Sequence, residues 1–229
     1  MDTGKNGKIA VLAGTPVDTQ MGTSLLENHG LEGMAFPLTD NPRRQVEFQL
    51  MSLEDKRRIV RQVLAAAVKQ GCRRVLVYCN SLSGSVDFPA LEAEMGVRIV
   101  TPMDTYREIA WQYRRIGVIA ANAQGLSGIE RVLYAVNPKI ELLEGGLLTV
   151  VEGIEAGEPP EKIVERFRLT ELAEWFQRCG AQALLLGCTH FPYFKAALEK
   201  RIKLPVLEPS EGMIRLLTED HGFKHCPVD

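Results

Sequence analysis

The feature that most constrains the fold is a repetition, because short apolar segments of the first half return in the second half in the same order. The matching segments, at offsets of about 107 to 109 residues, are 9–13 with 116–120, 71–79 with 180–188, and 99–102 with 206–209. Each is a short apolar run that turn or polar residues end, which is typical of a strand buried on both faces. The sequence therefore predicts an internal duplication of roughly 105 residues.

Helix signals lie between the apolar runs. Ser52 precedes Glu54 and Asp55 in an approximate capping box. The segment that follows ends at Lys69, just before Gly71, as a helix would. Strand, helix and strand in alternation predict a parallel sheet with helices on both faces. We therefore expect an α/β protein of two similar flavodoxin-like lobes with mostly parallel sheets, related by a pseudo-twofold axis, with the active site in the cleft between them.

The repeat also predicts the domain boundaries. We expect the first lobe to comprise residues 1–101 together with 209–229, because a helix-like stretch from Glu211 follows the second repeat. The second lobe should comprise residues 102–208.

Composition narrows the class of protein. The chain has 229 residues and a net charge of −2, which gives no general case for nucleic-acid binding. No apolar run approaches the roughly 18 residues of a membrane span, and residues 1–8 do not lead into the long apolar region of a secretory signal. Five cysteines are an odd and low count, so we expect free thiols and a cytoplasmic protein.

Two of the cysteines hold equivalent places in the repeat. Cys79 and Cys188 each follow an apolar strand directly, and ligands of open α/β sheets bind beyond that end of the strands. Two facing lobes would place the two thiols on opposite sides of one cleft. Cys72 and Cys179 each adjoin the glycine that precedes a strand, so we expect them to serve packing, and Cys226 to be incidental.

The residues after these cysteines can bind a small molecule. Asn80 with Ser81, and Thr189 with His190, offer side-chain donors and acceptors beside backbone N–H groups, which suits a carboxylate. Asn80 and Thr189 could also be simple helix caps. The loop that follows residues 9–13 has neither the dinucleotide fingerprint nor the lysine of a phosphate-binding loop, so a nucleotide cofactor is not indicated.

Two thiols on opposite faces of one molecule suit the inversion of a stereocentre beside a carboxylate. One group removes the Cα proton and the other delivers a proton to the opposite face, so the two should be chemically alike. A free thiol has a pKa of about 8.5, and general-base catalysis improves when its pKa approaches 7. His190 or a helix N-terminus could lower the pKa of Cys188, and Asp18 could have a matching part near Cys79.

The motifs carry a family resemblance. Residues 186–192 (LGCTHFP) resemble the second cysteine motif of the aspartate/glutamate racemase superfamily, and residues 78–81 (YCNS) resemble the first, in which the family usually has Thr at the place of Ser81. Residues 14–16 (GTP) lie where the family has its N-terminal substrate loop, which makes Thr15 a candidate ligand.

The resemblance implies a cofactor-independent racemase that does not use pyridoxal phosphate and needs no metal, often as a homodimer. It implies Cys79 and Cys188 as the acid/base pair. It also implies that Asn80, Ser81, Thr189 and His190 bind the carboxylate and amino groups of the substrate.

The sequence departs from the family motifs at two places, so it does not determine whether aspartate or glutamate is the preferred substrate. The first loop has Ala13-Gly14-Thr15 where glutamate racemases have Asp-Ser-Gly, and Glu155 stands where aspartate racemases would have lysine. An acidic residue there would repel a side-chain carboxylate. Arg43 or Arg44 could compensate, and Gln45 could add a neutral hydrogen bond.

Other interpretations remain open. The same superfamily includes hydantoin racemisation and isomerisation of small diacids, and a two-lobe protein could bind a ligand without catalysis. A redox dithiol is disfavoured because Cys79 and Cys188 are not in a Cys-x-x-Cys arrangement. A metal site would need three or four converging ligands, and the candidates are Cys188 with His190, and His221 with His225 and Cys226.

Overall fold

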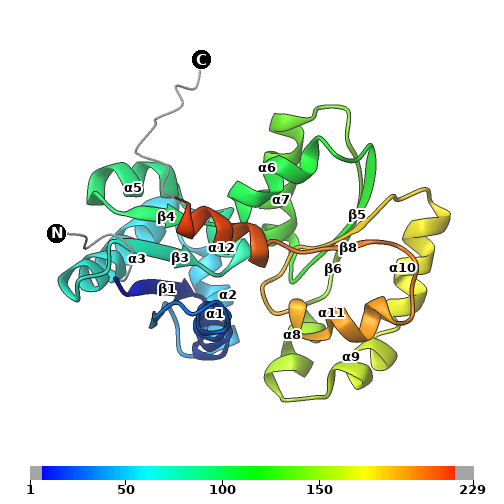
Figure 1. Ribbon diagram of the computed structural model, residues 1–229, viewed down its shortest axis with the longest axis horizontal. Coiled ribbons are helices and arrows are strands. Elements are labelled where there is room, and N and C mark those ends of the chain that lie inside the picture. Colours follow the sequence, from blue (N-terminus) through cyan, green and yellow to red (C-terminus); the bar gives the residue numbers. More distant parts are fainter. Residues whose placement is uncertain (1–6, 220–229) are drawn as a thin grey trace.

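Each lobe of the protein is built on one parallel sheet. The computed structural model describes residues 7–219 and shows two lobes side by side (Figure 1). The first sheet has the order β2-β1-β3-β4 and the second β6-β5-β7-β8, and every neighbouring pair is parallel. The two orders are the same once the repeat is allowed for, and they are flavodoxin-like. The predicted fold class is therefore confirmed.

The elements alternate along the chain as the repeat predicts. The strands are β1 (Ile9–Ala13), β2 (Gly33–Pro37), β3 (Arg74–Val77), β4 (Arg98–Val100), β5 (Arg115–Ala120), β6 (Glu141–Gly146), β7 (Leu184–Leu186) and β8 (Val206–Leu207). The helices before β5 are α1 (Pro16–Asn28), α2 (Pro42–Leu50), α3 (Leu53–Lys69), α4 (Asn80–Ser83), α5 (Phe88–Met95) and α6 (Pro102–Ala110). The later helices are α7 (Ala123–Val136), α8 (Leu148–Glu155), α9 (Pro160–Arg166), α10 (Leu169–Arg178), α11 (Pro192–Glu199) and α12 (Ser210–Thr218).

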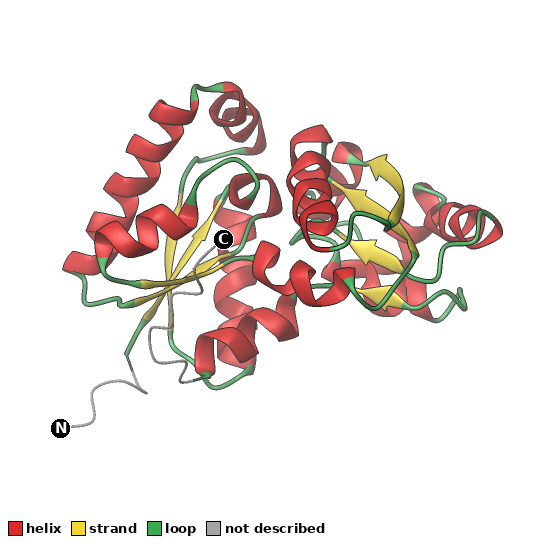
Figure 2. Ribbon diagram, turned by 90° about the horizontal axis from the view of Figure 1, so that it is seen from above, coloured by secondary structure: helices red, strands yellow, loops and turns green. Residues whose placement is uncertain are grey.

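Helices cover both faces of each sheet (Figure 2). In β1, Ala10 and Leu12 pack into one apolar cluster, whereas Ile9 and Val11 pack into the cluster on the other face. Because both faces of such a strand are buried, its sequence is a continuous apolar run rather than an alternation of apolar and polar residues. None of the helices within residues 7–219 is long and apolar enough to cross a membrane.

The local signals around α3 behave as predicted. The hydroxyl of Ser52 accepts a hydrogen bond from the backbone N–H of Asp55, with an N–O distance of 3.1 Å, and so caps the helix. Gly71, which follows the helix, has a φ of 89°, a conformation that glycine adopts without strain.

The last helix returns to the first sheet. Met213, Ile214 and Leu217 of α12 share an apolar cluster with β1, and Figure 1 shows α12 beside β3 and β4. Met103 and Tyr106 of α6 instead pack into a cluster of the second lobe. The boundaries at residues 101 and 209 stay a prediction, and residues 1–6 and 220–229 lie outside the described part.

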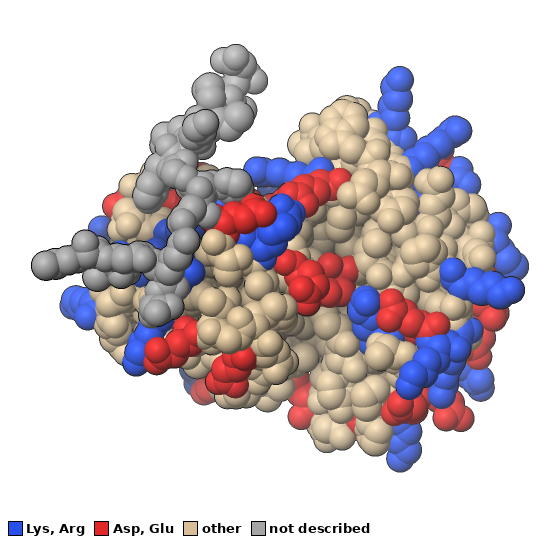
Figure 3. All heavy atoms as spheres, in the orientation of Figure 1, with Lys and Arg blue, Asp and Glu red and all other residues tan. Residues whose placement is uncertain are grey.

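Two glycines allow the lobes to touch closely at backbone level. Gly84 follows α4 of the first lobe, and Gly128 lies in α7 of the second. A Cβ atom added to either glycine would lie 2.7 Å from the Cα of the other, closer than van der Waals contact allows. The guanidinium of Arg131 donates to the carbonyl of Gly84 at the same place. On the face seen in Figure 3, a furrow separates the lobes and charges of both signs are interspersed.

This contact predicts the effect of an added methyl group. Gly128→Ala should lower the free energy of unfolding by about 1–3 kcal/mol, because backbone rather than a flexible side chain would have to move. Urea denaturation measures the change. Gly125→Ala in the same helix is the control, since its nearest neighbour would lie 3.4 Å away, and it should be neutral or gain up to about 1 kcal/mol of helix propensity. Equal losses for both variants would contradict the close contact.

Candidate active site

A single small cavity collects most of the residues that the sequence singled out. It lies between the lobes and has a volume of about 30 Å³, room for one or two water molecules. The first lobe contributes Asp18, Gln45, Val46, Gln49, Cys79, Asn80 and Ser81 to its lining. The second lobe contributes Ala121, Asn122, Gly125, Leu148, Val151, Gly187, Cys188, Thr189 and His190. This lining, drawn from residues 7–219, includes no lysine or arginine.

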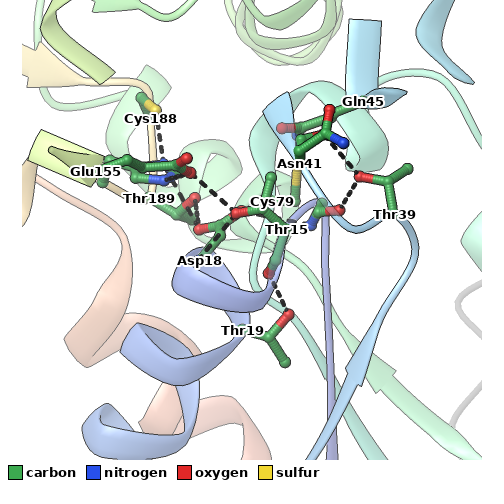
Figure 4. A network of polar contacts seen from close by, with 12 residues as sticks. Thr15, Asp18, Thr19, Thr39, Asn41, Gln45, Cys79, Glu155, Cys188 and Thr189 are labelled. Atoms are coloured by element: carbon green, nitrogen blue, oxygen red, sulfur yellow. Dashed lines mark hydrogen bonds and ion pairs between the residues drawn. The ribbon is translucent and has the colours of Figure 1, made fainter. Parts of the chain in front are cut away.

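The two predicted cysteines face this one cavity. Cys79 follows β3 and Cys188 follows β7 after one residue, and both are buried, with exposed fractions of 3% and 6%. Figure 4 shows Cys188 on the second-lobe side of the site and Cys79 on the first-lobe side. The strands β3 and β7 hold the same place in the two sheets, so the repeat itself brings the thiols together.

A buried cluster of charges lies beside Cys188. His190 directs Nε2 to the Glu155 carboxylate at 3.0 Å, and Nδ1 lies 3.6 Å from an Asp18 oxygen and 3.8 Å from the Cys188 sulfur. Thr189 donates its hydroxyl to the same Asp18 oxygen at 2.9 Å. Asp18 belongs to α1 of the first lobe, so these contacts join the two lobes.

The proton balance of this cluster follows from burial and charge together. Burial lowers the pKa of His190, but the Asp18 carboxylate, with Cys188 and Glu155, outweighs it and raises that pKa well above its usual value. Burial raises the pKa of Asp18 against the opposing effect of His190. Burial also acts to raise the pKa of Glu155, yet the hydrogen bonds from His190 and Thr15 leave it lowered. We therefore treat His190 as an imidazolium between two carboxyl groups.

Cys79 has a different environment. The amide nitrogen of Gln45 donates to its sulfur at 3.4 Å, and the hydroxyl of Ser81 lies 3.5 Å away. Burial, followed by the charge of Asp18, raises the pKa of Cys79 to about 12 despite the hydrogen bond from Ser81. The two-base chemistry predicts thiols that are alike, but amide and hydroxyl groups surround one sulfur and a cation lies beside the other.

Asn80 holds a free donor at the cavity wall. Its side-chain oxygen accepts a hydrogen bond of 2.5 Å from the hydroxyl of Tyr106, which fixes the amide. Its Nδ2 is buried and has no hydrogen-bond partner among the residues the structure describes. A buried donor without a partner is costly, and an anionic ligand in the cavity would satisfy it.

Thr15 is the one predicted site residue that does not line the cavity. Its hydroxyl donates to Glu155 at 2.9 Å and accepts from the backbone N–H of Asp18 at 3.2 Å. Arg43 and Arg44 are exposed, and Arg44 pairs with Asp40 at the surface. Neither arginine lines the cavity.

Sequence reasoning missed Gln49 and Asn122, which both line the cavity. Gln49 lies four residues after Gln45, a spacing that places both on one face of α2. Asn122 follows β5 where Thr15 follows β1, so the repeat could have found it. The metal candidates beyond residue 219 lie outside the described part, within which no group of three or more His, Cys, Asp or Glu side chains is arranged to hold a metal.

Comparison with known proteins gives sequence relatives named glutamate racemase. No family model matches the chain. It is 33% identical over 144 residues to glutamate racemase of Gloeobacter violaceus, which covers 59% of this chain and 51% of the relative. It is 24% identical over 157 residues to glutamate racemase of Limosilactobacillus reuteri, which covers 66% and 58%. The chain thus matches somewhat over half the length of these curated relatives.

Solved structures share the fold over nearly the whole chain. A glutamate racemase from Francisella tularensis, crystallised with D-glutamate, has a TM-score of 0.72 at 19% identity and covers 93% of this chain and 80% of that one. An aspartate racemase homologue from Pyrococcus horikoshii has a TM-score of 0.67 at 16% identity and covers 92% and 96%. Allantoin racemase from Klebsiella pneumoniae has a TM-score of 0.61 at 16% identity and covers 94% and 91%.

The chain is a two-lobe α/β protein with the fold of the solved racemases named above. The resemblance seen in the cysteine motifs is confirmed: the chain has the fold and the sequence relatives of the aspartate/glutamate racemase superfamily.

The charge cluster predicts a pH-dependent loss of stability in His190→Gln. Because the pKa of His190 is raised in the folded state, its contribution is complete below the unfolded pKa of about 6.5 and declines as pH rises through the folded value. The variant should lose about 3 kcal/mol at pH 6, as for a broken buried pair, and less at pH 9. Urea denaturation at both pH values measures this. His29→Gln is the comparison, since His29 pairs with Glu211 at the exposed surface, and its loss at pH 6 should be much smaller. A loss that is independent of pH would contradict the imidazolium.

Proposed function

We propose that this chain is an amino-acid racemase that works without pyridoxal phosphate, with Cys79 and Cys188 as its acid and base. The observation that carries the proposal is that both thiols line one cavity from opposite lobes. The relatives named glutamate racemase support the same reaction class.

The proposed chemistry is a proton transfer on each face of one carbon. A cysteine thiolate takes the Cα proton, and the electron pair of the C–H bond moves into the adjacent carboxylate to form an enediolate. The other cysteine thiol then delivers its proton to the opposite face of Cα. Each turnover therefore exchanges the protonation states of the two sulfurs, and the reverse reaction or solvent restores them.

The surroundings of the sulfurs support a resting assignment. Cys79 is a thiol at neutral pH, since its pKa is raised to about 12 by burial and by Asp18. Cys188 is the other member of the proposed pair, and its sulfur lies 3.8 Å from the His190 ring. The unpartnered Nδ2 of Asn80 is the donor that we assign to the enediolate oxygen, where developing charge gains most from a fixed dipole.

The lobes must separate to admit a substrate. A cavity of about 30 Å³ holds water but no amino acid. Contacts that join the lobes, such as Thr189 with Asp18 and Thr15 with Glu155, must therefore break or shift on entry.

Glutamate is the substrate that we propose first, with aspartate second. The named relatives favour glutamate. Glu155 bonds to Thr15 and His190, so its charge is already partnered and its repulsion of a substrate carboxylate is reduced. With no lysine or arginine in the lining, we assign the substrate side chain to neutral donors such as Gln45. The homodimer and the cytoplasmic location stay predictions.

A panel of single enantiomers in D₂O tests the function. Glutamate or aspartate should lose optical rotation and gain deuterium at Cα, and allantoin, a hydantoin and a small diacid complete the panel. Failure of every amino acid to exchange would overturn the proposal. Tight binding of an amino acid without exchange would favour a two-lobe binding protein instead.

Substitution of each cysteine tests the assignment of the two bases. Cys79→Ser and Cys188→Ser should each lower racemisation by about 100- to 10,000-fold, the usual contribution of a general acid or base. Each variant should retain Cα exchange for the one enantiomer whose proton faces the remaining thiol. Cys72→Ser, at a buried packing position, is the control and should keep the activity. Full racemisation by either active-site variant would contradict the two-base scheme.

A further inference from the structure

A chain of hydrogen bonds crosses from the second lobe to Cys79. Asn122 donates its Nδ2 to the side-chain oxygen of Gln49 at 2.9 Å. Gln49 donates its own amide nitrogen to the hydroxyl of Ser81 at 2.7 Å. That hydroxyl lies 3.5 Å from the sulfur of Cys79. Gln49 and Ser81 are both buried, so water does not compete freely for these groups.

The helix cap of α7 fixes the direction of the chain. The Oδ1 of Asn122 accepts from the backbone N–H of Gly125 at 3.0 Å, as an N-cap does. The other end of this amide must then be the donor that meets Gln49. Gln49 in turn accepts with its oxygen and is left to donate with its nitrogen.

The direction of these hydrogen bonds determines which acceptor the Ser81 hydroxyl hydrogen can reach. Because its oxygen accepts from Gln49, the hydroxyl is free to donate its own hydrogen, and the Cys79 sulfur is the acceptor that the structure places beside it. A hydrogen bond given to a thiolate stabilises the charged form. Gln45 adds a second donor to the same sulfur.

We propose that Gln49 and Asn122 are positioning residues that, only when the lobes are closed, orient the Ser81 hydroxyl toward the sulfur of Cys79. The role in catalysis rests on the proposed function. Lobe closure and the readiness of Cys79 to accept a proton are then coupled, since Asn122 belongs to one lobe and Gln49 to the other.

Other charges near Cys79 act at the same time. Asp18 of α1 and Cys188 after β7 both disfavour its thiolate. His190 lies beyond them, between Asp18 and Glu155 of α8. A test of the hydrogen-bond chain must therefore separate it from charge acting through space.

Asn122→Asp should reverse the direction of these hydrogen bonds and still cap the N-terminus of α7. A carboxylate caps a helix as well as an amide does, but it has no hydrogen to give to Gln49. The Gln49 amide is expected to turn, to donate to the new carboxylate and to accept from Ser81, which withdraws the hydroxyl hydrogen from Cys79. Gln49→Glu is the second variant, because its carboxylate would accept from Asn122 and Ser81 alike.

The first measurement does not depend on activity. The Cβ carbon of Cys79, followed by NMR in cysteine-labelled protein and assigned with Cys79→Ser, reports the thiolate fraction at alkaline pH. Asn122→Asp should lower that fraction about three- to tenfold at a given pH. Asn41→Asp is the matched control, since Asn41 caps α2 in the same way at an exposed place, and it should leave the titration unchanged.

The Ser81→Ala background separates the two effects. Without the Ser81 hydroxyl, the hydrogen bonds that start at Asn122 no longer reach Cys79. Asn122→Asp should then leave the titration of Cys79 unchanged. An equal shift with and without Ser81 would show charge acting through space and would overturn the proposal. No shift in either Asn122→Asp or Gln49→Glu would overturn it as well.

Isotope effects then test the coupling to catalysis. With Cα-deuterated enantiomers, Asn122→Asp should raise the isotope effect on kcat/KM in the direction in which Cys79 removes the proton and lower it in the other. A merely structural loss would leave both unchanged. If wild-type protein racemises nothing but the NMR shift appears, the positioning role stands and the proposed function falls. If the protein racemises and neither the titration nor the isotope effect changes, the proposed function stands and the positioning role falls.

Discussion

The structure depends on a cation buried between the two lobes. His190 lies against Glu155 of its own lobe and Asp18 of the other, and Thr189 adds a hydrogen bond to the same Asp18 oxygen. Removing such charges from water costs several kcal/mol, and their mutual attraction offsets this cost only in good geometry. The net contribution of the cluster to the free energy of unfolding is therefore small. The cluster joins the two lobes beside the cavity that Cys79 and Cys188 line.

The two similar lobes have unlike sites. The repeat supplies a strand followed by a cysteine in each lobe, and two residues after the cysteine stands Ser81 in one lobe but His190 in the other. Gln45 of α2 reaches Cys79, whereas Cys188 meets the His190 ring two residues further on. The proposed two-base scheme needs one protonated and one deprotonated sulfur, and burial together with Asp18 keeps Cys79 protonated.

Local patterns predict the parts of the molecule that local forces determine. The apolar runs indicate β1 and β5, and the capping signal at Ser52 indicates the start of α3, because burial and backbone hydrogen bonds act over a few residues. Gln49 and Asn122 could not be paired from the sequence, since their contact depends on how the lobes meet. Nor could the sequence predict that Thr15 and His190 bond to the Glu155 carboxylate, because both come from distant segments. The repulsion that we expected of Glu155 did not allow for these partners.

A crystal structure of the protein with one enantiomer of glutamate bound tests the central claim most directly. We predict that Cys79 and Cys188 lie on opposite faces of the substrate Cα, each sulfur near the roughly 3–3.5 Å of a reacting pair. We also predict that the substrate carboxylate accepts from Nδ2 of Asn80. Both sulfurs on one face of Cα, or a substrate bound outside the space between them, would contradict the two-base scheme.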